Sequence, residues 1–411
     1  MVIGSGGREH AIVDALYRSD KVSKIYCAPG NAGIAAMAEC VPVKDTDVDG
    51  LLGFASEKGI DLTVVGPEAS LSEGVVDAFR AAGLRIFGHT RDAARIESSK
   101  EFAKRLMIKY GIPTASYRVF SDYDEAVEYV NSRPFPAVLK YDGLAAGKGV
   151  VIAEDAESAR EALASMLLDR SFGQGSVVVE DWLEGPEFSF MCFVDGDNVY
   201  PMPLAQDHKR AFDGDSGPNT GGMGAYTGLP FISEADRDFA FSEIMCKAAS
   251  GMKAEGCPLS GVLYGGLMKT ADGIKVIEFN ARFGDPETEV VLPLLESDIT
   301  DIFCAVADGR KAASPRWSES VSIGVVLASK GYPGSYDKGA GIEIPEHLSG
   351  KIYHMGTAVS DGRLVTAGGR VLMPVCKGAT IADARAEVYK IASQIKCDKL
   401  FYRSDIAHQA L

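Results

Sequence analysis

The sequence lacks the features that mark several large classes of protein. In its 411 residues no apolar run approaches the length of about 20 residues that a membrane-spanning helix requires. The 57 Asp and Glu residues outnumber the 42 Lys and Arg, which leaves a formal net charge of −15 and no basic excess for a nucleic-acid backbone. The start, MVIGSGGREH, has no basic segment leading into an apolar stretch, as a secretory signal would. We therefore expect no membrane or nucleic-acid partner.

Signals for disulfides and zinc are also missing. The eight cysteines are scattered without a CxxC pair, and the six histidines form no cluster with metal-ligand spacing. In a long chain without a signal peptide, such cysteines are expected to be buried free thiols in a reducing cytoplasm. They are Cys27, Cys40, Cys192, Cys246, Cys257, Cys304, Cys376 and Cys397.

A glycine-rich stretch, KYDGLAAGKGV at 140–150, is close to a phosphate-binding P-loop but fails its requirements. A P-loop needs four residues between its glycines and a Ser or Thr after the lysine. Here only three residues separate Gly143 from Gly147, and Gly149 follows Lys148. The two lysines, Lys140 and Lys148, around a run of small residues still predict contact with phosphate.

The first hundred residues repeat a unit of strand, glycine turn and helix. Apolar segments end in turns at GSGG, GNAG, GPE and GHT, with amphipathic stretches between them. This rhythm predicts a doubly wound parallel α/β sheet, in which ligands bind at the carboxyl ends of the strands. GSGGRE is a poor dinucleotide fingerprint, because Glu9 stands where the third Gly or Ala belongs. A nicotinamide dehydrogenase is thus a weak alternative, although the turn could hold a lone phosphate.

From Ser98 onward helices and strands follow one another in the manner of an α+β fold. SSKEFAKRLMIKYGIP predicts a helix closed by Gly111, and GVLYGGLMKTADGIKVIEFN predicts a hairpin that turns at 271–273. The stretch 206–226, rich in Gly and Asp, is expected to be irregular, and so long a loop is usually functional. No heptad or long apolar stripe demands a partner chain, so we expect a monomer or a weak homodimer.

Three polar residues, Glu278, Asn280 and Arg282, lie two apart at the end of the predicted hairpin. On a strand such residues point to the same face. Carboxylate and amide oxygens side by side suit a Mg²⁺ ion that carries substrate phosphates, and the arginine offers a fixed fork for phosphate or carboxylate. A solvated strand face is the alternative, but the tight acidic turn GDPE follows at once at 284–287 and favours a functional site.

Two further segments carry weaker signals. VVVEDWLEGPEF at 177–188 pairs an apolar strand with acidic residues, of which Glu187 could accept from ribose hydroxyls; a solvated turn is the alternative. In DSGPNTGGMGAY the glycines permit close approach to a ligand or a moving cover. The charged residues at 207–210, just before it, argue against a floppy surface loop.

Together these motifs resemble one family. SGGREHA, APGNAG, VGPE, LKYDGLAAGKGV, QDHKR, GPNTGGMGAY, EFNARFGDPET and GGRVL occur in the family's order and cover essentially the whole chain. The chain is similar to the glycinamide ribonucleotide synthetases, which are ATP-grasp ligases of purine biosynthesis. The resemblance implies that ATP converts glycine to glycyl phosphate, which 5-phosphoribosylamine turns into glycinamide ribonucleotide. It also implies Mg²⁺ or Mn²⁺ as cofactor, and the two small molecules, glycine and phosphoribosylamine, as partners.

The resemblance assigns roles to the residues that match the family's motifs. The expected ATP contacts are Lys104, Lys140, Gly143, Gly147, Lys148, Gly149, Val179, Glu180, Leu183 and Glu187. The expected substrate contacts are Gly6, Gly7, Asn31, Gly33, Glu68, Asp207, Pro286 and Glu287. The expected catalytic residues are Arg282, Asp285, Lys209 and Arg210, and the expected metal ligands are Glu278 and Asn280.

The resemblance also divides the chain. It implies an N-terminal Rossmann-like substrate domain at 1–98, an ATP-grasp domain at 99–312 with a small lid at about 115–183, and a C-terminal mixed α/β domain at 313–411. Ser404 and Ala407 stand where the family usually has Lys and Gly. Another ATP-grasp carboxylate–amine ligase or carboxylase would share the lysines and metal ligands but differ around GDPE and the N-terminal turns. A non-catalytic nucleotide-binding regulator would be favoured by loss of a metal ligand or lid lysine, and both are present.

Overall fold

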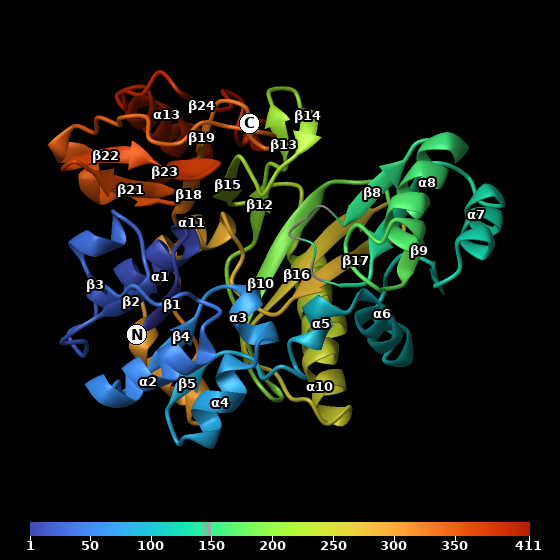
Figure 1. Ribbon diagram of the computed structural model, residues 1–411, viewed down its shortest axis with the longest axis horizontal. Coiled ribbons are helices and arrows are strands. Elements are labelled where there is room, and N and C mark those ends of the chain that lie inside the picture. Colours follow the sequence, from blue (N-terminus) through green and yellow to red (C-terminus); the bar gives the residue numbers. More distant parts are fainter. Residues whose placement is uncertain (144, 146–148) are drawn as a thin grey trace.

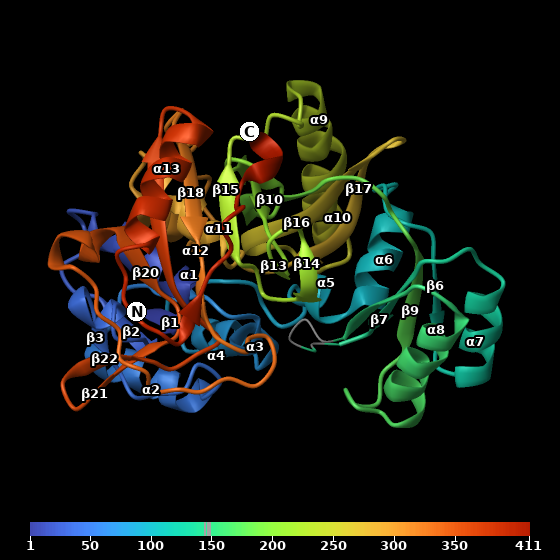
Figure 2. The same cartoon turned by 90° about the horizontal axis from the view of Figure 1, so that it is seen from above.

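The computed structural model describes residues 1–143, 145 and 149–411. The long strands β10 (Glu187–Asp195), β16 (Ser260–Thr270) and β17 (Gly273–Asn280) lie in the middle of the molecule (Figure 1). The N-terminal and C-terminal parts lie together on one side of them, and a small unit, built on the sheet of β6 to β9 with helices α7 and α8, lies on the other, as Figure 2 shows from above. No helix of the described part is long and apolar enough to cross a membrane.

The N-terminal part is a five-stranded sheet with the order β3-β2-β1-β4-β5, in which all neighbours are parallel. The strand order reverses between β1 and β4, so the glycine turns that follow these two strands meet at the crevice where such sheets bind ligands. The doubly wound sheet predicted from the sequence is confirmed. Its elements are β1 (Val2–Gly4), α1 (Gly7–Tyr17), β2 (Tyr26–Pro29), η1 (Ile34–Ala36), β3 (Glu39–Cys40), α2 (Val48–Lys58), β4 (Thr63–Val65), α3 (Glu68–Ser72), α4 (Val75–Ala81) and β5 (Ile86–Phe87).

The small unit, residues 117–181, is called the lid below. Its antiparallel sheet has the order β6-β9-β7-β8. Asp122 and Asp155 accept hydrogen bonds from N–H groups in the first turns of its two helices, which fixes where each begins. The lid encloses a core of its own that includes Leu139, Leu163 and Val177. The elements here are α5 (Arg95–Ser98) and α6 (Lys100–Lys109) before the lid, then β6 (Tyr117–Phe120), α7 (Tyr123–Asn131), β7 (Ala137–Tyr141), β8 (Val150–Ala153), α8 (Ala156–Leu163), its π-helical continuation η2 (Ala164–Leu168) and β9 (Val177–Asp181).

The central sheet has eleven strands and runs in the order β17-β16-β10-β12-β15-β18-β23-β19-β24, with β11 on β10 and β20 on β23. β18 and β23 come from the C-terminal part and continue the sheet from β15, so the sheet passes through the boundary expected at 312–313. The remaining elements are β11 (Asn198–Pro201), β12 (Ala205–Asp207), β15 (Gly224–Thr227), α9 (Glu234–Phe239), η3 (Ala240–Cys246), α10 (Lys247–Ala254), α11 (Glu287–Val291), η4 (Leu292–Leu294), α12 (Ile299–Ala307), β18 (Val321–Val325), β19 (Leu327–Ser329), η5 (Glu346–Lys351), β20 (Ile352–His354), β21 (Thr357–Ser360), β22 (Arg363–Thr366), β23 (Arg370–Gly378), α13 (Ile381–Ala392), β24 (Leu400–Phe401) and η6 (His408–Ala410).

Outside the lid, the cores join distant parts of the chain. One cluster includes Phe79, Phe190 and Leu372, from the N-terminal, central and C-terminal parts. In a second cluster the Phe87 and Phe303 rings lie 4.4 Å apart between centroids. These three parts therefore bury their apolar surface against one another, whereas the lid does not need them for its core.

Two loop predictions have different outcomes. The hairpin predicted to turn at 271–273 is confirmed, since Thr270 pairs with Gly273. The prediction that 206–226 is irregular is wrong, because β12 and β15 belong to the central sheet and β13 (Arg210–Phe212) pairs with β14 (Ser216–Asn219) between them. All of β14 is exposed and it contains Gly and Pro, so no alternation of apolar residues marks it in the sequence.

Candidate active site

A pocket opens between the lid, helix α6 and the end of strand β17. It brings together residues that the sequence predicts for nucleotide, metal and substrate. These are Glu68, Lys104, Lys140, Gly143, Gly149, Glu180, Glu278, Asn280 and Arg282. Further lining residues, which the sequence did not single out, are Ile96, Glu97, Lys100, Ala103, Met107, Ala145, Val150, Ile277 and Phe279.

Two buried lysines share one carboxylate in this pocket. Lys104 Nζ on α6 and Lys140 Nζ on β7 each lie 2.9 Å from an oxygen of Glu180 on β9, and no side chain of the three is more than 5% exposed. Lys104 also donates to Thr114 Oγ1 at 2.7 Å, and Lys140 donates to the carbonyl of Ile277 at 2.9 Å. Burial lowers the pKa of Lys104 to about 8, although Glu180 opposes the shift. Two ammonium groups with one carboxylate between them leave positive charge to meet phosphate oxygens.

Glu278 and Asn280, at the end of β17, form an oxygen-rich edge of the same pocket. The Asn280 amide nitrogen lies 3.4 Å from Glu278 Oε1. Burial acts to raise the pKa of Glu278, but nearby lysines, above all Lys140, outweigh it and lower the pKa, so the carboxylate is ionised. Hard oxygen donors beside buried lysines fit Mg²⁺, which takes one or two protein ligands and completes its shell with substrate phosphates and water. In the described part of the chain no group of three or more His, Cys, Asp or Glu could hold a metal ion.

Arg282 is held in place by carboxylates from two other segments. Its Nε lies 3.3 Å from Glu68, after β4, and its Nη2 lies 3.2 Å from Glu97 in α5. The same guanidinium donates to Asn280 Oδ1 at 3.3 Å. Burial acts to lower the pKa of Arg282, but Glu97 and Glu68 raise it, so this arginine is a permanent cation next to the predicted metal ligands. Nothing in the local sequence marks Glu97, because its partner lies 185 positions further along the chain.

A second ion pair joins Lys209, which follows β12, to Glu187 at the start of β10. Burial acts to lower the pKa of Lys209, but Glu187 and Asp207 raise it well above its ordinary value. Burial also raises the pKa of Asp207. The Arg210 guanidinium points elsewhere, since it donates to the carbonyl of Gly217 at 2.9 Å within its own hairpin. Lys209 is therefore placed beside the predicted ribose ligand, and Arg210 is not; the catalytic roles of both stay predictions.

The acidic turn after β17 is fixed by partners from distant segments. Arg370 Nη1, on β23, lies 2.9 Å from Asp285 Oδ1. Glu287 Oε1 accepts from Ser189 Oγ at 2.7 Å and from the Tyr264 hydroxyl at 2.8 Å. The turn predicted to grip glycine or the transferred phosphoryl group is thus rigid, and Arg370 is a partner that the sequence analysis missed.

A buried carboxylate that the sequence analysis also missed lies under the first glycine turn. Glu289 on α11 has no exposed surface, and neither of its oxygens has a hydrogen-bond partner among the described residues. Burial and the nearby Asp285 raise its pKa well above the ordinary value. A Cβ atom added to Gly7 would lie 2.4 Å from Glu289 Oε1, so a larger residue at the start of α1 would require the Glu289 side chain to move.

The turn after β2 lies against the C-terminal part. The Asn31 amide donates to the carbonyls of Ser5 and His354 at 2.8 Å each, and its oxygen accepts from the N–H of Gly33 at 2.9 Å. A Cβ atom at Gly33 would lie 2.3 Å from His354 Cγ. The Asn31 side chain therefore shapes the crevice at the carboxyl end of the sheet, and its predicted contact with substrate stays a prediction.

The remaining predicted residues lie around the pocket or outside the described residues. Val179 is part of the lid core, and Leu183 is half-buried just after β9. Pro286 packs against Gly222. Gly147 and Lys148 lie outside the described residues.

The fold and the pocket together define a class. A small lid with an antiparallel sheet contributes Lys140 and Glu180, and the central sheet contributes Glu278 and Asn280. A pocket between a small antiparallel lid and a larger sheet, lined by buried lysines and oxygen donors and without a P-loop motif, is typical of an ATP-grasp protein.

Comparisons with known proteins agree and narrow the class. The phosphoribosylglycinamide synthetase N domain matches residues 1–97, the ATP-grasp (A) domain of the same enzyme matches 98–288, and its C domain matches 322–409. The phosphoribosylamine–glycine ligase of Halalkalibacterium halodurans is 50% identical over 415 residues, covering 100% of this chain and 97% of that one. The crystal structure of phosphoribosylamine–glycine ligase from Thermotoga maritima matches with a TM-score of 0.87 and 35% identity over 98% of both chains. A biotin carboxylase from Campylobacter jejuni, at 15% identity and a TM-score of 0.76, shares the fold. The chain belongs to the phosphoribosylglycinamide synthetase family.

Proposed function

We propose that the protein is an ATP-dependent ligase that joins glycine to 5-phosphoribosylamine and releases glycinamide ribonucleotide, ADP and phosphate. The observation that carries the proposal is the pocket in which Lys104 and Lys140 stand beside Glu278 and Asn280, in a chain that matches this family over its whole length. ATP-grasp ligases use ATP and a divalent metal, and this pocket offers ligands for both.

Amide formation needs activation because a carboxylate resists attack by an amine. A carboxylate oxygen of glycine attacks the γ-phosphorus of ATP, the bond to ADP breaks, and glycyl phosphate forms. The amine nitrogen of phosphoribosylamine then attacks the acyl carbon, phosphate leaves, and the nitrogen loses a proton. No covalent bond to the enzyme forms, so the side chains act by positioning and by neutralising charge.

The residues of the pocket divide this work. Lys104, Lys140 and the glycine-rich stretch 143–149 contact the phosphates, and the strand end around Val179, Glu180 and Leu183 lies along the adenine. Glu187 accepts from the ribose. Glu278 and Asn280 hold the metal ion, Mg²⁺ or Mn²⁺, which when bound neutralises charge on the phosphates.

Glycine and phosphoribosylamine bind towards the crevice of the N-terminal sheet. Arg282 and Asp285 hold glycine and the transferred phosphoryl group, with Lys209 and Arg210 from the neighbouring loop. Phosphoribosylamine lies on the turns after the parallel strands, with its phosphate at the start of α1, since the N-terminus of a helix favours an anion. The residues proposed for this side are Gly6, Gly7, Asn31, Gly33, Glu68, Asp207, Pro286 and Glu287. We also propose domains at 1–98, 99–312 and 313–411, a monomer or weak homodimer, and a cytoplasmic location.

The test is ADP formation by the purified protein with Mg-ATP, with glycine and phosphoribosylamine added separately and together, and with the product weighed by mass spectrometry. Turnover that needs both substrates and yields the mass of glycinamide ribonucleotide supports the proposal, and Glu278→Ala should abolish it. Turnover with a different carboxylate or amine would support an ATP-grasp ligase but would reject glycine or phosphoribosylamine as its substrate. Binding of ATP without turnover would identify a regulator.

A further inference from the structure

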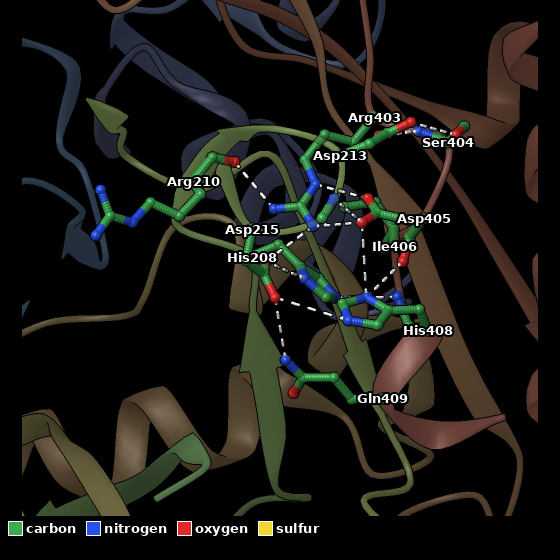
Figure 3. Close-up of polar contacts among 12 residues, drawn as sticks. His208, Arg210, Asp213, Asp215, Arg403, Ser404, Asp405, Ile406, His408 and Gln409 are labelled. Atoms are coloured by element: carbon green, nitrogen blue, oxygen red, sulfur yellow. Dashed lines mark hydrogen bonds and ion pairs between the residues drawn. The ribbon is translucent and has the colours of Figure 1, made fainter. Parts of the chain in front are cut away.

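The hairpin β13–β14 and the end of the chain lie side by side, although about 190 residues separate them (Figures 1 and 3). Gly214 N donates to Asp405 Oδ2 at 2.8 Å, and Ser404 N donates to Asp213 Oδ1 at 2.8 Å. The segment 403–409 thus covers a hairpin that begins at Arg210, one residue after the lysine that pairs with Glu187. The QDHKR motif at 206–210 does not by itself account for these contacts between the hairpin that follows it and the segment 403–409.

Arg403 is the centre of this contact, and its side chain has no exposed surface. Its Nε and Nη2 donate to the two oxygens of Asp405 at 2.7 and 2.8 Å, and Nη2 lies 2.9 Å from Asp215 Oδ1. Its Nη1 donates to the main-chain carbonyl of Arg210 at 3.0 Å (Figure 3). A buried guanidinium with four such contacts fixes the position of each partner, because its donors form a rigid fork.

The residue on the other side of Lys209 is held by the same segment. His208 Nε2 accepts from the N–H of Ala407 at 3.0 Å, and its ring stacks on Tyr226. Its Nδ1 lies 3.7 Å from Asp215 Oδ1. Ala407 has a φ of 64°, in the left-handed region that favours glycine, and this backbone conformation directs its N–H at the imidazole. Burial lowers the pKa of His208, so Nε2 is free of a proton and can accept this bond.

Both neighbours of Lys209 in the sequence, His208 and Arg210, are therefore hydrogen-bonded to the segment 403–409. Its own carbonyl accepts from the N–H of Thr220 at 2.7 Å and from the Thr220 hydroxyl at 2.8 Å. The Lys209 side chain takes no part in these contacts, and its Nζ pairs with Glu187, the proposed ribose ligand.

We propose that Arg403 and Asp215, where the segment 403–409 meets the hairpin, are positioning residues for Lys209: they set its backbone and so hold its ammonium group at the reacting phosphate and glycine. The inference rests on the proposed function. A displacement of about 1 Å at such a group can lower turnover on the order of 100-fold.

The test compares three variants of the full chain. Arg403→Lys keeps the charge but loses the fork, and Asp215→Asn removes one partner while Arg403 keeps Asp405. Arg385→Met is the matched control, because Arg385 on α13 holds the same segment through the carbonyls of Ile406 and Ser404 without touching the hairpin. Each variant is measured for turnover number, for ATP affinity by calorimetry, and for the rate at which acetic anhydride modifies Lys209, read by mass spectrometry.

If the segment positions Lys209, Arg403→Lys and Asp215→Asn should lower the turnover number on the order of 100-fold and speed modification of Lys209, with ATP affinity retained. Arg385→Met should leave both close to wild type. Unchanged modification and turnover in Arg403→Lys, or equal changes in Arg385→Met, would overturn the proposal. The labelling rate needs no substrate, so it decides the positioning role even if the wild-type protein makes no glycinamide ribonucleotide.

Discussion

Replacing Glu180 by Gln should destabilise the free protein and at the same time enlarge its stabilisation by nucleotide. Glu180 is the carboxylate that Lys104 and Lys140 share, at 2.9 Å from each. Gln keeps the shape but not the charge, so two buried ammonium groups would remain with neutral partners at Thr114 and Ile277.

The magnitude follows from burial. All three side chains are at most 5% exposed, and breaking a buried ion pair by removing one partner costs about 3–5 kcal/mol. The phosphates of ATP bring negative charge to the same two lysines, so bound nucleotide should recover much of the loss. The increase in unfolding free energy on adding a saturating, non-hydrolysable Mg-ATP analogue should then exceed the wild-type increase by a comparable amount.

Urea unfolding with and without the analogue measures both effects. Asp181→Asn is the matched control, because Asp181 is the next residue of β9 and pairs with Arg133, but their side chains are 32% and 37% exposed. An exposed pair is worth about 0–1 kcal/mol, so this variant should unfold nearly as the wild type does. If Glu180→Gln lost no more stability than Asp181→Asn, or gained no more from nucleotide, the account of the two lysines would be wrong.

Three further predictions concern charge, metal and space. Because the pKa of Lys104 is lowered to about 8, ATP affinity should fall as pH rises through 8, and binding near pH 8.5 should take up protons. Calorimetry in two buffers measures this proton uptake, and Lys104→Arg should flatten the dependence of ATP affinity on pH. Glu278→Gln should raise the Mg²⁺ concentration for half-maximal activity by about tenfold or more, because even the loss of an outer-sphere partner lowers metal affinity by about 10–100-fold. A Mg²⁺ titration that superposes on that of the wild type would exclude Glu278 as a ligand. Gly33→Ala should raise the KM for phosphoribosylamine without changing ATP affinity, because its Cβ would overlap His354, whereas Gly53→Ala, which meets nothing within 4 Å, should leave both constants unchanged.

Features that depend on neighbouring residues were predictable. Glycine turns at strand ends predicted the parallel sheet, and the spacing of Glu278, Asn280 and Arg282 predicted that they share one face. In the structure, Asn280 lies within hydrogen-bond distance of Glu278 and of Arg282. Local spacing was sufficient for Glu278 and Asn280 because a strand fixes the direction of each side chain, whereas Arg282 lies two residues beyond the end of β17.

Features that depend on packing between distant segments were not predictable. Glu97 and Arg370 acquire their importance from partners that only the folded chain places beside them. The hairpin 210–219 was missed because β14 is exposed and polar, and its strands are defined by backbone pairing with no apolar pattern to mark them. The Glu289 carboxyl likewise looks like an ordinary acidic helix residue until its burial is known.

The continuous sheet from β17 to β24 has a mechanical consequence. Each strand from β17, which carries Glu278, to β24 is hydrogen-bonded to its neighbours in the sheet. We therefore expect this half of the molecule to move as one rigid body. The lid, with its own core, is the part that can swing on its two connecting segments. We therefore expect the lid to open for ATP without disturbing the crevice of the N-terminal sheet, whose core is shared with the central and C-terminal parts.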